Sequence, residues 1–125
     1  MNIIVMKFGG TSVASNRKLK NVAEIVSQEL KNNKIIVVLS AMAGETNKLQ
    51  SYLDEFKSKN SIESDLVLTS GEQVTIGLLS AILKNKGIKS IPLLGWQVPI
   101  ITDKNYEKAK ILKIDKKRIQ NYFSD

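Results

Sequence analysis

Two short hydrophobic runs, separated by a helical pattern, organise the first third of the chain. Residues 2–8 and 34–40 are largely apolar and rich in β-branched side chains, which is typical of strands buried on both faces of a parallel sheet. Between them, apolar side chains recur at i, i+3, i+4, i+7 and i+11 from Leu19, so a helix is predicted from about Ser15 to Lys31. Strand, helix and strand in this order form a βαβ unit with parallel strands. The predicted fold class is therefore α/β.

The remaining pattern predicts helices and short strands added to that unit. The longest helical region is expected to break or kink at Gly71, because glycine is a poor helix former. Pro92 lacks an amide donor, so its strand should end there or lie on an edge. We expect a layered parallel sheet of three or four strands with flanking helices, in one domain covering 1–125. The further elements are helices over 49–56, 62–86 and 116–123, the last capped by Asp115, and strands at 89–94 and 111–114.

A glycine turn follows the first predicted strand, in the stretch Lys7-Phe8-Gly9-Gly10-Thr11-Ser12-Val13. Glycines let the backbone turn sharply and bring its amide groups close to an anion, and a following helix start adds further donors. Lys7 supplies a full positive charge at the end of the strand, where open α/β sheets bind ligands. The stretch therefore indicates a phosphate site. A tight β–α turn with a surface lysine explains the same residues and remains open.

Two later stretches carry candidate substrate-binding residues. Small and hydroxyl side chains from Ser40 to Thr46 follow the second strand, where substrate contacts are expected. The alternative is a plain loop with Thr46 or Asn47 as a helix cap. Glu72 either receives the ammonium group of a ligand or lies in the first turn of a helix capped by Ser70, where the helix dipole favours a carboxylate.

Composition limits the chemistry that these residues can perform. The chain has no cysteine and no histidine, so disulfides, a thiol nucleophile and the commonest general base are excluded, and no metal site is predicted. The net charge of +7 comes from dispersed residues, almost all lysine, without interleaved aromatics, so nucleic-acid binding is not expected. The continuous apolar runs are short for a membrane span, and the N-terminus lacks a signal-peptide pattern. A cytoplasmic protein is predicted.

Four stretches, in order along the chain, resemble the pattern of the aspartate kinases, a family with the amino-acid kinase (carbamate kinase-like) fold. They are Lys7–Val13, residues 38–47, residues 70–72, and residues 95–97 with the following Thr102-Asp103. The resemblance implies transfer of a phosphoryl group from ATP to the β-carboxylate of L-aspartate. The products would be ADP and 4-phospho-L-aspartate, at the entry to lysine, threonine and methionine biosynthesis. ATP and Mg²⁺ are the expected cofactors.

The resemblance also implies roles for particular residues. Lys7 would be catalytic, holding the phosphoryl group in transfer, while hydroxyl residues and Glu72 would bind aspartate, the glutamate through the α-ammonium group. Because the acceptor carboxylate is already ionised, this chemistry needs no added base, and positioning with charge neutralisation is sufficient. The implied phosphate-binding residues are Lys7, Gly9, Gly10, Thr11 and Ser12, and the implied substrate-binding residues are Ser40, Thr46 and Glu72.

The resemblance covers only the first part of the family's catalytic domain. A nucleotide-binding half and C-terminal ACT regulatory domains have no counterpart in residues 1–125. We therefore expect an aspartate kinase fragment that is inactive alone. Uncovered strand edges and apolar surface would favour a homo-oligomer or a partner chain that supplies the missing half. The alternatives are half of a split enzyme, and a non-catalytic remnant that binds an anion or a small acidic ligand.

Overall fold

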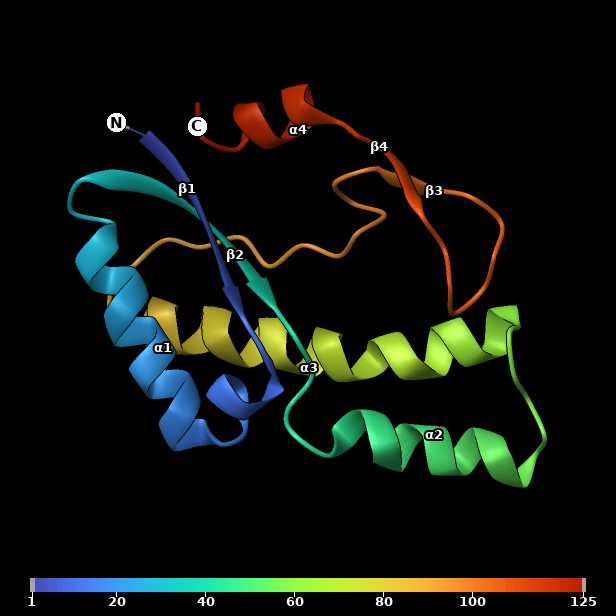
Figure 1. Cartoon of the computed structure of the whole chain (residues 1–125). Helices are drawn as coiled ribbons and strands as arrows, with labels where there is room; N and C mark the ends of the chain where they lie inside the picture. The colour runs from blue at the N-terminus through green and yellow to red at the C-terminus, as the bar shows by residue number, and fades with distance from the viewer. Residues whose placement is uncertain (1, 125) are drawn as a thin grey trace.

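The computed structural model describes residues 2–124 and has the α/β architecture predicted from the sequence (Figure 1). Two parallel strands lie beside a layer of three helices, and a small hairpin and a short helix complete the chain. In order, the elements are β1 (Asn2–Phe8), the 3₁₀ turn η1 (Gly10–Val13), α1 (Asn16–Glu29), β2 (Asn33–Leu39), α2 (Glu45–Glu55), α3 (Ile62–Asn85), β3 (Ile100–Thr102), β4 (Ile111–Ile114) and α4 (Lys116–Asn121).

The βαβ unit forms as predicted. β1 and β2 pair in parallel and in register, from Asn2 opposite Asn33 to Phe8 opposite Leu39. Ser15 caps α1, because its side chain accepts a hydrogen bond from the Lys18 amide at 3.3 Å. The glycine turn differs in one respect from the prediction. It leads first into η1, and α1 begins only after Ser15.

The hydrophobic core lies on one face of the two strands. The buried side chains come from η1, α1 and α3, and alternate residues of β1 and β2 pack against them. The opposite face is more open, with Val5 62% exposed and Val38 44% exposed. The prediction of strands buried on both faces was therefore wrong for β1, because the helices that form this core pack on one face only. The fully or nearly buried apolar core residues are Val13, Leu19, Val22, Ala23, Val26, Leu79 and Leu83.

Helix α3 runs without a break from Ile62 to Asn85, so the predicted break or kink at Gly71 was wrong. Ser70 caps nothing, because its hydroxyl donates to the Val67 carbonyl at 2.6 Å within the same helix. The true N-cap is Ser61, which exchanges hydrogen bonds with Ser64 in a capping box. Interactions with the rest of the fold, described below for Gly71, outweigh the weak helix propensity of one glycine.

By length and composition α3 could also cross a membrane, with a mean hydropathy of 1.5 over its most apolar 18-residue window. In this fold it is instead the central helix of the layer, and its Leu79 and Leu83 belong to the hydrophobic core. Only 22% of that window is buried, however, so much of its uncharged surface faces outward.

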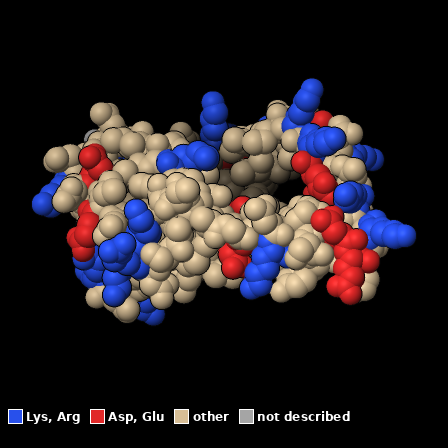
Figure 2. Space-filling model, turned by 60° about the horizontal axis from the view of Figure 1, so that its bottom comes forward, with Lys and Arg blue, Asp and Glu red and all other residues tan. Residues whose placement is uncertain are grey.

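Figure 2 shows that lysine and arginine side chains are scattered over the visible face of the molecule.

The last third of the chain departs from the predicted sheet. Residues 89–94 form no strand, because neither β1 nor β2 pairs with them. β3 and β4 pair antiparallel with each other in a separate hairpin. The prediction of one sheet with three or four parallel strands was therefore wrong. The described part of the chain contains one parallel pair and one separate antiparallel pair. α4 forms as predicted, with Asp115 as its N-cap, and Lys34 donates to the Phe123 carbonyl at 3.1 Å.

The tip of the hairpin is fastened to the start of α3 by carboxylate–amide hydrogen bonds. The Asn60 amide donates to Glu107 Oε1 at 2.7 Å, and the Glu107 amide donates to Asp65 Oδ1 at 2.9 Å. Hydrogen bonds from the Ser64 side chain and the Asn60 backbone hold the pKa of Glu107 below its ordinary value of 4.5. Glu107 has a left-handed backbone, with φ of 61°, to make these contacts. The bonds favour the ionised carboxylate, so they tie the hairpin to α3 best when Glu107 is charged.

A titration of the Asn60 amide tests this attachment. Because the folded pKa of Glu107 is depressed, its contribution is present above 4.5 and is lost as the pH falls through the lower folded value. We expect the ¹⁵N–¹H NMR signal of Asn60 to titrate with a midpoint below 4.5. Glu107→Gln keeps an acceptor oxygen but should remove the titration. A midpoint at or above the ordinary value would contradict the hydrogen bond.

Candidate functional site

The loops after β1 and β2 are joined by backbone hydrogen bonds at the carboxyl ends of the strands. The Ser40 amide donates to the Phe8 carbonyl, and the Ala43 amide donates to the Gly10 carbonyl, each at 3.2 Å. A side chain at Gly10 would have its Cβ 3.1 Å from the Ala41 carbonyl oxygen. Glycine therefore suits this position because of the close approach of the two loops, and not because of a positive φ.

The predicted phosphate-binding residues line the start of η1. Gly9 is the N-cap of this turn, and no side chain accepts a hydrogen bond from the amides there. Thr11 and Ser12 are exposed, and Ser12 donates its amide to the Gly9 carbonyl at 3.0 Å. Lys7 is exposed, on the open face of the strand pair, where its register partner is Val38. The described part of the chain provides no carboxylate in an ion pair with Lys7.

Glu72 reaches the same region from α3. Its Oε1 accepts a hydrogen bond from the Ala41 amide at 3.3 Å, and the side chain is partly buried. α3 begins ten residues earlier, so Glu72 does not lie in a first turn and the helix dipole does not explain it. The prediction of a first-turn glutamate was wrong. The carboxylate is instead held against the loop that follows β2.

Gly71 permits this contact. A Cβ built on Gly71 would lie 2.8 Å from the Ala41 Cβ and 3.4 Å from Leu49 Cδ1. Ala41 is only 2% exposed, so it has little space into which it could move. The absence of a side chain at Gly71 therefore sets the distance between α3 and the loop, and with it the position of Glu72.

The two hydroxyl residues predicted to bind substrate, Ser40 and Thr46, lie before and after Ala41 in the sequence. Ser40 is half-buried and directly precedes it, whereas Thr46 is exposed in the first turn of α2. Neither Thr46 nor Asn47 caps this helix. The N-cap is Gly44, whose left-handed backbone (φ 87°) makes glycine the favoured residue there. The alternative of a Thr46 or Asn47 cap is thus excluded.

The side chains of this region are those of Lys7, the carboxylates Glu45 and Glu72, and hydroxyl residues, together with backbone amides. No group of three or more histidine, cysteine, aspartate and glutamate side chains in residues 2–124 is arranged to hold a metal ion.

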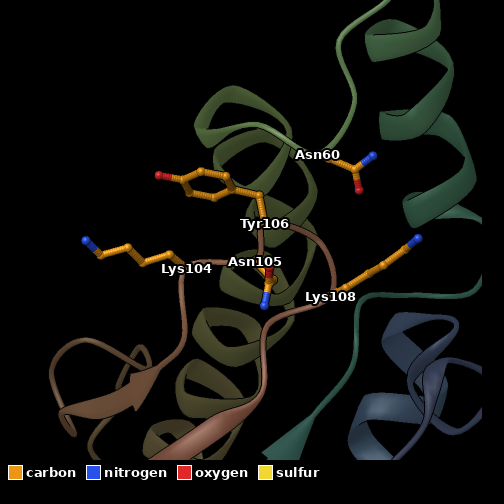
Figure 3. Close-up of a pocket in the computed structure, with 5 residues that line it drawn as sticks. All are labelled: Asn60, Lys104, Asn105, Tyr106 and Lys108. Carbon is orange, nitrogen blue, oxygen red and sulfur yellow. The ribbon is translucent and has the colours of Figure 1, made fainter.

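A hollow of about 430 Å³ lies elsewhere, between the hairpin loop and the turn before α3 (Figure 3). Its lysines point in opposite directions, and none of its residues belongs to the loops after β1 and β2. It is open and polar, and it is separate in sequence from the site described above. The lining residues are Asn60, Lys104, Asn105, Tyr106 and Lys108.

Sequence reasoning missed the residues that assemble the site. Ala41 supplies the amide that holds Glu72, and Gly71 and Gly44 set the local backbone geometry. The sequence did offer a signal, because Ala41, Gly44 and Gly71 are all small residues. The predictions were instead placed on the hydroxyl and charged residues beside them. Only spatial proximity, which the sequence pattern does not encode, identifies Ala41 and Gly71 as partners.

Comparison with known proteins defines the class to which this fold and these loops belong. Residues 2–125 match the amino acid kinase family. The chain belongs to this family.

Its relatives are more specific. Over 98% of its length, this chain is 45% identical to an aspartokinase of Rickettsia felis. Over the full length of this chain, it is 42% identical to an aspartokinase of Bacillus sp.. It covers 32% and 31% of those proteins, so it spans about a third of the curated relatives that it matches. The solved aspartate kinase of Synechocystis matches 77% of this chain, with 37% identity and a TM-score of 0.72, and this match covers 17% of that protein. The suspected resemblance to the aspartate kinases is confirmed.

Substitution of Gly71 tests how the site is assembled. We expect Gly71→Ala to destabilise the protein by about 1–3 kcal/mol in chemical denaturation, because the new methyl group overlaps Ala41. Ala41→Gly should relieve the overlap, so that the double variant is more stable than the sum of the single changes by about 1 kcal/mol or more. Gly77→Ala, where a Cβ meets nothing within 4 Å, is the matched control and should stabilise the helix. Independent, additive effects of Gly71→Ala and Ala41→Gly would contradict the contact.

Proposed function

We propose that this chain forms the aspartate- and phosphate-binding part of an aspartate kinase. In the reaction, an oxygen of the aspartate β-carboxylate attacks the γ-phosphorus of ATP. A new P–O bond forms, the bond to the β,γ-bridging oxygen breaks, and ADP leaves with that electron pair. The products are 4-phospho-L-aspartate and ADP, and no proton has to be removed from the attacking carboxylate.

The observation that carries this proposal is the hydrogen bond between Glu72 and the Ala41 amide. It brings a carboxylate from α3 to the loop after β2, which is itself bonded to the glycine turn after β1. The turn after β1, the loop after β2 and the middle of α3 thereby meet at the carboxyl ends of the two strands. In the described part of the chain only Oε1 of Glu72 accepts a hydrogen bond, which leaves the second carboxylate oxygen for an ammonium group.

The proposed roles follow from charge and position. Lys7 neutralises the phosphoryl group in transfer, and the backbone around Gly9 and Gly10, with Thr11 and Ser12, surrounds the phosphate oxygens. Ser40 and Thr46 contact aspartate, and Glu72 binds its α-ammonium group. Mg²⁺ accompanies the ATP phosphates and supplies further charge neutralisation.

The remaining partners are part of the same proposal. The chain spans about a third of its curated relatives, so the nucleotide contacts come from sequence beyond these residues or from a second chain. We assign no role in nucleic-acid binding, because the basic residues are scattered (Figure 2), and none in membrane binding, because Leu79 and Leu83 of α3 belong to the hydrophobic core. The site is proposed to work in the cytoplasm, within lysine, threonine and methionine biosynthesis.

Removal of Lys7 tests the phosphate subsite. Because its side chain is exposed, Lys7→Ala should change stability by no more than about 0.5 kcal/mol. In the original chain, inorganic phosphate should shift the NMR amide signals of Gly9, Gly10 and Thr11. We expect the variant to lose this response, with binding weakened at least about tenfold, since a charged partner is gone.

Lys20→Ala on α1 is the matched control and should leave the phosphate response unchanged. The same samples serve for an assay of ADP release with aspartate, ATP and Mg²⁺. We expect no turnover from the chain alone. Phosphate binding that is equal in Lys7→Ala and the original chain would overturn the subsite.

Glu72 can be tested by separating its charge from its hydrogen bond. Glu72→Gln keeps an acceptor for the Ala41 amide, so we expect stability close to the original but aspartate binding weakened about tenfold or more by calorimetry. Glu72→Ala should also leave the Ala41 amide without its partner, at a cost of about 1–3 kcal/mol in stability. Equal aspartate affinity in Glu72→Gln, or no aspartate binding by the original chain, would refute the assignment.

A further inference from the structure

The β3–β4 hairpin exposes apolar side chains on both of its faces. Ile114 lies opposite Ile100, and Ile101 lies opposite Lys113. Because successive side chains of a strand point to opposite sides of a sheet, Ile101 and Ile114 lie on different faces of the hairpin. They are 50% and 40% exposed, so neither face is fully covered by the rest of the described chain. A two-stranded hairpin of this kind is marginally stable in water, so burial against a partner would stabilise it.

Positive charge surrounds these apolar residues. From position 103 to position 118 the chain has seven cations and three carboxylates. The carboxylates are already occupied, because Asp103, Glu107 and Asp115 each accept a hydrogen bond from a backbone amide. None of the ion pairs among the described residues involves a cation of this stretch. These seven cations are Lys104, Lys108, Lys110, Lys113, Lys116, Lys117 and Arg118.

The edges of the hairpin are poorly suited to pairing with a further strand. β3 has three residues, and the pairing shifts by one residue between Ile101 and Thr102, as in a β-bulge. The Ile100 amide is already used, because it donates to the Gly95 carbonyl at 3.0 Å. Short strands, bulges and lysines are the features that keep sheet edges from pairing. A partner would therefore recognise the side chains of the hairpin and not its backbone.

We propose that this hairpin binds a flexible acidic protein segment that also carries large apolar side chains. Carboxylates of the segment pair with the seven cations, and its apolar side chains cover Ile101 and Ile114. A flexible segment can follow both faces of the hairpin, since it orders only on binding. Lys104 and Lys108 point in opposite directions from the loop at the tip, so positive charge is available on both sides (Figure 3). Charge complementarity identifies the partner as acidic.

The same observations disfavour three other occupants. A second copy of this chain would bring two positively charged hairpins together. A bilayer surface is flat and would meet only one of the two apolar faces. A nucleic acid would supply phosphates but no aliphatic side chains, and the two strands carry no aromatic residue on which bases could stack.

The proposed contact is independent of the proposed catalytic roles. Ile101, Lys110 and Lys113 lie outside the phosphate and aspartate subsites, so binding of a segment and binding of those ligands are separate measurements. The exposed area is small, and we expect the affinity for a single segment to be modest, with a Kd of about 10–100 μM.

A peptide of about 15 residues, built from glutamate and leucine, is the probe. We expect it to shift the NMR amide signals of residues 100–118 and to bind less tightly as the salt concentration rises. Joint reversal by Lys110→Glu and Lys113→Glu should weaken binding about tenfold, because two attractions become repulsions. Ile101→Ser should weaken it to a similar extent, because an apolar contact is lost. An unchanged Asn60 amide signal would show that the hairpin of each variant remains attached to α3.

Matched changes on α1 separate this surface from general charge and hydrophobicity. Lys18→Glu with Lys20→Glu alters the net charge equally, and Ile25→Ser removes an isoleucine that is 44% exposed, so neither should affect binding. A glutamate–serine peptide should bind at least about tenfold more weakly than the glutamate–leucine peptide. Equal binding of the two peptides, equal losses in the α1 variants, or no binding of the glutamate–leucine peptide would overturn the proposal. Binding only to phosphatidylglycerol vesicles or to single-stranded DNA would overturn it in favour of that partner.

Discussion

The proposed aspartate site depends on the close packing of α3 against the loop after β2. Gly71 and Ala41 approach so closely that one additional methyl group would overlap. The contact places Glu72 beside the Ala41 amide, and the same loop is bonded to the glycine turn after β1. A single steric constraint thus couples three segments that are remote in sequence. Packed interiors deform little. The packing of α3 at Gly71 therefore determines where the Glu72 carboxylate lies.

The parts of the fold that were predictable are those determined by local pattern. The βαβ unit follows from two β-branched runs and one stripe of apolar residues, and Ser15 and Asp115 cap their helices as local hydrogen bonding predicts. The strand expected at 89–94 did not form, although its composition is suitable. A strand requires a neighbour to accept its hydrogen bonds, and whether one is present is a property of the whole fold.

The ligand-binding roles expected of the candidate site residues stay predictions, but the structure does test the local geometry expected around them. The loops that contain Gly10 and Ser40 do lie together, with Glu72 of α3 against the second of them, but Gly71 was expected to interrupt a helix that is continuous. Helix propensity is a weak preference of about 1 kcal/mol for glycine, which tertiary contacts readily exceed. The error has a clear consequence. Once α3 is continuous, the helix dipole no longer accounts for Glu72, and its contact with the loop becomes the reason for its position.

A continuous α3 also connects the site with the surface on its other side. The inner face must be smooth enough at Gly71 and Thr75 to lie against the loop and the sheet, and these positions are fully buried. The outer face then has no core to cover it, yet it carries few of the charges that usually cover an exposed helix. Solvation alone does not favour such a surface, since exposed apolar area of this kind is typically covered by another surface. The helix that positions the carboxylate with its inner face therefore also presents a largely uncharged outer face.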